Sequence, residues 1–222
     1  MELNDVFNSE NRFFSAMNKL WDLIILNFLF FLTVIFGIGP AASALYYAIA
    51  KNIRRGRSYA ARSFFHSFRM NFKQGFIIGI FQLIGAVSLW YCYAFAMSMD
   101  GQETIAQVYF TVWIVFTALY LFISAYVYPI LSRFSMPVRK MLKMAFVISL
   151  RHLPSSLLIT LIFAAEVFVA WLFSPASIPI VLIIGASGYV LLKSLIMEKI
   201  LKKYTPKPAE GEEESTDTWY LE

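Results

Sequence analysis

The lysines and arginines of this chain are confined to a few short stretches, and residues 20–50, 74–132 and 152–192 contain neither. A soluble domain carries about 25% charged residues and cannot leave such long gaps on a wetted surface. A lysine or arginine at the centre of a bilayer costs about 2.5–3.5 kcal/mol even on the most lenient scale, so membrane-spanning helices exclude both. The gaps therefore predict an all-α polytopic integral membrane protein.

The composition agrees with this class, because 59% of the residues are hydrophobic and only 15% are charged. The net charge of +5 comes from basic residues that flank apolar segments. We therefore expect them to meet the anionic headgroups of the lipid bilayer, and we expect no nucleic acid as a partner. One cysteine, Cys92, and two histidines, His66 and His152, predict neither an internal disulfide nor a metal cluster. No cofactor or nucleotide-binding motif is present, so no cofactor is expected.

Five segments are long and apolar enough to span a bilayer, which takes about 20 residues. They belong to one membrane domain, residues 1–203. The first segment contains Gly37, Gly39 and Pro40, and the proline removes a helical hydrogen bond. One kinked span and a re-entrant pair of shorter helices both fit this break. The predicted spans cover residues 21–50, 76–97, 105–130, 155–173 and 178–197.

Basic residues alternate between the connections of these spans. Seven lie in residues 51–73, five in residues 133–151 and five after residue 192, but residues 98–104 and 174–177 hold none. The positive-inside rule then predicts a cytoplasmic C-terminus and an N-terminus outside. A re-entrant first segment would instead place the N-terminus inside.

The two long basic connections have the period of amphipathic helices that lie on the cytoplasmic membrane surface. Each precedes a hairpin of two spans, so we expect two parallel repeat units, residues 58–130 and 137–197. The apolar stripe of the first connection is predicted to be Ala61, Phe65, Phe68 and Phe72. The second connection sets Arg139, Lys140 and Lys143 beside Met141, Met144, Ala145 and Ile148.

Three stretches of this chain resemble the YesL family, small bacterial membrane proteins found mainly in Gram-positive Firmicutes. They are the Gly39-Pro40-Ala41 turn with residues 44–47, the arm of residues 64–75, and residues 149–154. The likeness covers nearly the whole chain apart from its acidic tail. It implies the bacterial plasma membrane as location. Genes of this family tend to neighbour carbohydrate ABC importers and polysaccharide-degrading enzymes, which implies a role near sugar uptake. The family has no agreed functional residues.

Three polar residues inside the predicted spans are candidates for an intramembrane site. Glu166 is an acid near the middle of its span and lacks a compensating cation, because cations are excluded from the predicted span interiors. A functional carboxylate and a protonated structural one are both consistent with this position. Gln82 and Asn27 favour hydrogen bonds between helices, and a shared polar cavity is expected if either faces Glu166.

A basic cluster in the first connection is a surface for lipid or for a cytoplasmic partner, and the second connection adds to it. The cluster consists of Arg54, Arg55, Arg57, Arg62 and Arg69.

The tail, residues 204–222, is acidic and proline-containing, and we expect it to be disordered.

Three functions follow as hypotheses. The first is a non-enzymatic accessory protein that assists or regulates carbohydrate uptake, with an ABC-type sugar importer as its partner. The second is a small-solute transporter in its own right that uses the intramembrane carboxylate, and it would form an oligomer because five short spans enclose little volume. The third, a membrane enzyme, lacks paired acids, a nucleophile with its base, and a metal cluster.

Overall fold

The computed structural model describes residues 3–53, 59–99 and 103–205, and every regular element within these ranges is helical. Five of the helices are long and apolar enough to cross a membrane, which confirms the predicted all-α polytopic class. The long helices are α1 (Leu3–Val34), α4 (Phe72–Met97), α5 (Glu103–Arg133) and α7 (Leu153–Leu172), and α9 (Ala186–Leu201) is the main part of the fifth apolar segment, Ile178–Tyr204. The short elements are α2 (Ile38–Ala48), α3 (Ala60–Met70), α6 (Val138–Arg151), α8 (Ile178–Ile180), the π-helical turns η1 (Ile49–Ile53) and η2 (Val181–Gly185), and a final 3-10 turn η3 (Lys202–Tyr204).

The long helices expose large apolar side chains along most of their length. Phe81 and Trp90 of α4, Phe116 of α5 and Trp171 of α7 are each at least 60% exposed. Soluble proteins rarely expose a contiguous apolar patch of more than about a few hundred Å². Lipid, which is itself apolar, is the solvent that suits these helices.

The first predicted span, residues 21–50, is corrected by the structure, because it consists of two helices. Helix α1 ends at Val34, and α2 begins at Ile38. Gly37 has a φ of 152°, which other residues rarely adopt, so the chain turns there. Pro40 lies in the first turn of α2, where its missing N–H costs no helical hydrogen bond. With 11 residues, α2 is about 16 Å long, too short to span a bilayer.

Helix α2 is buried almost all round and contacts α1, α3, α4 and α5. Its start lies directly against α4, backbone to backbone. A methyl group added at Gly39 would fall 1.9 Å from the carbonyl oxygen of Gly75, and one added at Gly75 would fall 2.8 Å from the nitrogen of Pro40. Gly79 completes this contact one turn further along α4. The predicted helix break is thus a packing surface as well as a turn.

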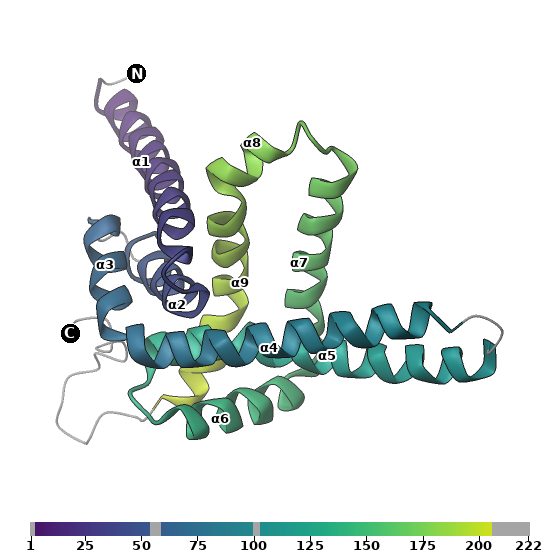
Figure 1. Cartoon of the computed structure of the whole chain (residues 1–222). Coiled ribbons are helices and arrows are strands. Elements are labelled where there is room, and N and C mark those ends of the chain that lie inside the picture. Colours follow the sequence, from purple (N-terminus) through teal and green to yellow (C-terminus); the bar gives the residue numbers. More distant parts are fainter. Residues whose placement is uncertain (1–2, 54–58, 100–102, 206–222) are drawn as a thin grey trace.

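The two helical hairpins extend in different directions from the body of the molecule (Figure 1). Helices α1, α7 and α9 rise on the same side, with α8 joining α7 to α9 at the top, whereas α4 and α5 run crosswise below them. Helix α6 lies beneath α5, and α3 lies beside α2. One buried core joins α5, α6 and the end of α9, the other joins α1, α2 and α3, and α2 contributes to both.

The element order recurs, since α3–α4–α5 and α6–α7–α9 each consist of a short helix followed by two long ones. A single residue joins the short helix to the first long one in both units, Asn71 in one and His152 in the other. The two hairpins extend in different directions (Figure 1), so the similarity of the units lies in the order of their elements.

Substitution of Gly75 tests the contact between α2 and α4. We expect Gly75→Ala to destabilise the protein by about 1–3 kcal/mol, because the added methyl group must push two backbones apart. Thermal unfolding in detergent measures the change. Gly188→Ala is the matched control, since a methyl group there meets nothing within 4 Å. Equal unfolding temperatures for the two variants would contradict the close contact.

Candidate functional site

A cavity of about 530 Å³ lies between the crosswise hairpin and the upright helices. Helices α1, α2, α4, α5, α7 and α9 all contribute to its wall, and most of the wall is apolar. Such a concave, largely apolar space with a few polar groups is the usual form of a small-molecule site. The polar groups of the wall are Tyr46, Gln82, Tyr120, Ser124, Tyr128, Thr160, Glu166, Tyr189 and Lys193.

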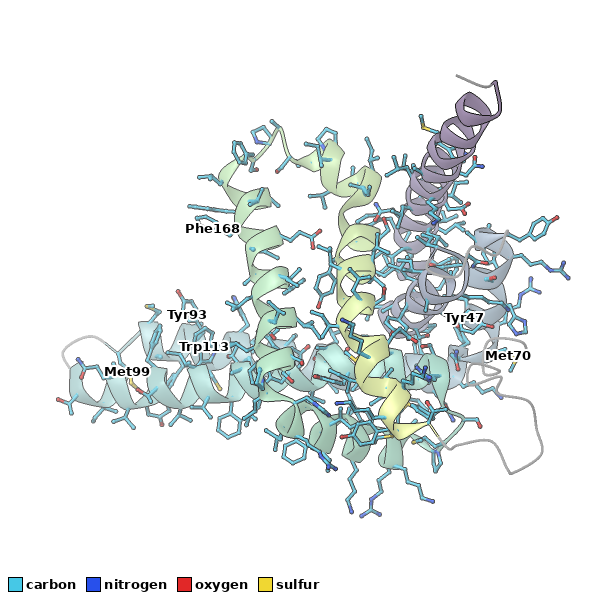
Figure 2. All side chains as sticks on the ribbon, turned by 180° about the vertical axis from the view of Figure 1, so that it is seen from behind. Tyr47, Met70, Tyr93, Met99, Trp113 and Phe168 are labelled. Carbon is cyan, nitrogen blue, oxygen red and sulfur yellow. The ribbon has the colours of Figure 1, made fainter. Side chains whose placement is uncertain are left out.

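Glu166 enters the cavity from the middle of α7 and is partly buried. Its Oε1 atom lies beside the first turn of α9, 3.3 Å from the position that a methyl group on Gly185 would occupy. Two residues further along α7, Phe168 points away from α9 (Figure 2) and is 59% exposed. The carboxyl group is therefore on the inner face of α7 and the apolar ring is on the outer face.

Lys193 is the residue that the sequence analysis did not find. It lines the same cavity from α9, and only 5% of its surface is exposed. Its Nζ atom lies 5.7 Å from the ring centre of Tyr189, which packs in turn against Phe163 of α7. Lys193 thus places a cation in the same cavity as Glu166, although no ion pair joins the two side chains. A lysine four residues after a tyrosine on one apolar helix face was the available signal.

Gln82 reaches the cavity from α4 and is held by two tyrosines of α5. The hydroxyl of Tyr128 donates to Gln82 Oε1, and that of Tyr120 donates to the Gln82 carbonyl oxygen at 2.9 Å. Gln82 Nε2 and Thr160 Oγ1 are buried and have no hydrogen-bond partner among the described residues. Gln82 and Glu166 therefore line the same cavity, whose wall is mostly apolar.

Asn27 does not line this cavity and has a structural position. Its Nδ2 donates to the carbonyl oxygens of Val181 (3.2 Å) and Leu182 (2.7 Å), and its Oδ1 accepts from the N–H of Ser187 at 2.9 Å. These groups belong to the π-helical turn and the start of α9, where the regular hydrogen-bond ladder is interrupted. Asn27 thus joins α1 to α9 and holds Gly185 next to Glu166.

The lower end of the cavity is held by a buried polar network. Tyr46 of α2 donates to Glu198 Oε1 at 2.7 Å, and Arg133 of α5 pairs with Glu198 Oε2 at 3.1 Å. The side chain of Arg133 is fully buried. Near this end, outside the spans, burial together with the charges of Lys203 and Arg151 holds the pKa of His152 below its usual value.

The basic residues that were predicted to form a lipid or partner surface do not line the cavity where the structure describes them. Arg139, Lys140 and Lys143 are exposed on α6, which buries Met141, Ala145 and Ile148 against the protein and leaves Met144 partly buried. On α3 the buried face is Ala60, Ser63, Phe64 and Ser67, so the predicted apolar stripe is displaced by one residue. The exposed face of α3 consists of Arg62, Phe65, His66, Arg69 and Met70, whereas Arg54, Arg55, Arg57 and the acidic tail lie outside the described residues.

Five apolar helices around a buried helix, with a cavity between them, define a multi-pass helical membrane protein. The family described as "Protein of unknown function, DUF624" matches residues 16–92, from α1 through most of α4. "Uncharacterized protein YesL" of Bacillus subtilis (strain 168) is 28% identical over 151 residues, which cover 66% of this chain and 69% of that protein. Both matches support the resemblance of this chain to the YesL family. No solved structure matches it.

Removal of Asn27 tests its position between α1 and α9. We expect Asn27→Leu to lower the stability by about 1–3 kcal/mol, because three backbone groups lose their partner in an apolar environment. Thermal unfolding in detergent measures this loss. Ser88→Ala is the control, since the hydroxyl of Ser88 is exposed and bonds only within its own helix. An unchanged unfolding temperature in Asn27→Leu would contradict the structural role of Asn27 between α1 and α9.

Proposed function

We propose that this protein binds a small solute in the cavity between its hairpins and carries it across the membrane. The observation that carries this proposal is the shared cavity of Glu166 and Lys193. Charged groups at membrane depth are costly and are retained mainly where they serve a substrate, an ion or a proton. The unpartnered Gln82 Nε2 and Thr160 Oγ1 atoms add hydrogen-bonding capacity to the same wall.

Uptake into vesicles tests this proposal. The full chain is reconstituted into vesicles. The exchange of radiolabelled sugars and amino acids across the vesicle membrane is then measured for a panel of solutes by counterflow. At least one solute should exchange through the wild type, and Glu166→Gln should slow that exchange at least tenfold without changing the unfolding temperature. Lys199→Gln, which alters an exposed lysine of α9, is the control. Equal exchange by Glu166→Gln and the wild type would remove Glu166 from the mechanism, and no exchange of any solute would overturn the proposed function.

We also propose a bacterial plasma membrane location with the C-terminus in the cytoplasm and the N-terminus outside. Two features support this direction. Helix α6 and the end of α9, which carry exposed cations, lie at the lower end of the molecule (Figure 1), and α1 begins at the upper end. The positive-inside rule assigns the basic end to the cytoplasm. A C-terminal fusion to green fluorescent protein checks this assignment. We expect the fusion to fluoresce if the C-terminus is cytoplasmic, and a dark fusion would reverse the proposed orientation.

The outward face of α3 supports a second function, assistance to a carbohydrate importer. Two exposed arginines, Arg62 and Arg69, flank the apolar side chains of Phe65 and Met70, a combination that suits either a lipid surface or an acidic partner. Co-purification of the tagged chain from native membranes distinguishes them. The accessory function predicts an importer subunit that is lost in the Arg62→Gln/Arg69→Gln variant and kept in an Arg139→Gln/Lys140→Gln control. Absence of any stable partner would contradict it.

A further inference from the structure

Glu166 and Lys193 line one cavity and do not pair with each other. Both are described by the structure, and no nitrogen–oxygen distance between them is within 4.0 Å. A buried lysine is nearly always paired, because an isolated charge in an apolar environment is costly. The ring of Tyr189 lies beside Lys193 Nζ, but a ring face carries no counter-charge. The cavity thus presents one acidic and one basic group that each face the space between α7 and α9.

The separation of these two groups follows from the place of Lys193 on α9 and from the point where Glu166 of α7 meets the start of that helix. The Glu166 carboxyl lies at the level of Gly185, eight residues before Lys193, which is about 12 Å along a helix. The lysine side chain reaches back towards Tyr189, one turn nearer to Gly185. The two charges are therefore about 6–12 Å apart. Two charge-assisted hydrogen bonds of about 3 Å each leave up to about 6 Å between the charges of a ligand that joins both.

We infer that the cavity binds a zwitterion, with its ammonium group on Glu166, its anionic group on Lys193, and its apolar part against the remaining wall. This inference rests on the proposed solute-binding function and names its substrate class. A neutral sugar would leave both charges without a counter-charge, and a single ion would satisfy only one of them. The apolar rings and aliphatic side chains of the wall favour a ligand with an apolar portion.

Two common sources carry this chemistry. A free α-amino acid with an apolar side chain holds an ammonium and a carboxylate close together. The ethanolamine headgroup of a phospholipid holds an ammonium near a phosphate and carries acyl chains. Both place opposite charges within the separation that the cavity allows, and the experiment tests each source in its own arm.

The first arm measures binding of soluble probes to the full chain in detergent by isothermal titration calorimetry. The probes are L-leucine, L-leucinamide (which lacks the carboxylate), N-acetyl-L-leucine (which lacks the ammonium) and maltose. The second arm places the chain in nanodiscs of phosphatidylglycerol, which lacks an ammonium group, with and without phosphatidylethanolamine, and counts retained lipids by native mass spectrometry. We expect binding of either L-leucine or phosphatidylethanolamine, and at least tenfold weaker binding of probes that lack one charge.

Variants separate recognition from folding. Glu166→Gln should no longer bind the probe without an ammonium more weakly, but it should still prefer probes with an anionic group. Lys193→Gln should lose the preference for an anionic group and keep the preference for an ammonium. A merely unfolded protein cannot give these opposite selectivities. Lys199→Gln should bind as the wild type does. If L-leucine is the ligand, its exchange into vesicles should follow the same pattern.

Three outcomes overturn the inference. The first is that neither zwitterion binds. The second is that Glu166→Gln, Lys193→Gln and the wild type bind the zwitterion with equal affinity. The third is that maltose binds in a manner that depends on Glu166. The last outcome would leave the proposed transport function intact and replace only the substrate class. Zwitterion binding without exchange of any solute in vesicles would keep the site and overturn transport.

Discussion

The backbone contact between the start of α2 and α4 is the constraint on which the rest of the structure depends. Gly39 and Gly75 allow two main chains to approach more closely than any side chain would permit. That contact places α2 in the centre, where it packs against α1, α3, α4 and α5 and contributes to both buried cores. It also brings the crosswise hairpin beneath the upright helices, so that the cavity has walls from both.

Polar groups inside the apolar helices fall into two kinds, and their partners distinguish them. Asn27 is fully buried and has its hydrogen bonds satisfied by η2 and the start of α9. The Tyr46–Glu198–Arg133 network likewise joins three helices. These groups stabilise the fold, because apolar surroundings strengthen a satisfied network and penalise a broken one. Gln82 Nε2, Glu166 and Lys193 instead face the cavity, which is the reason to assign them to a ligand.

Several parts of this arrangement were predictable from the residues alone. Helix α6 has the amphipathic pattern that was expected, and it buries three of the four apolar residues, Met141, Ala145 and Ile148, against the protein core. The stripe on α3 was displaced by one residue because α2 covers the side of Phe64, and no local pattern contains that contact. The break was expected at Gly37, Gly39 and Pro40, and the chain turns at Gly37, where φ is positive.

The sequence by itself determined that this protein is a helical membrane protein with five long apolar helices, because the cost of placing a cation in lipid depends on composition alone. It also indicated Glu166 as the acid most in need of explanation. Only the tertiary structure decided that Lys193, 27 residues further along the chain, shares a cavity with it. The reason is physical: which faces of two helices meet depends on the turn between them and on the helices around them, and here Asn27 and η2 set that register.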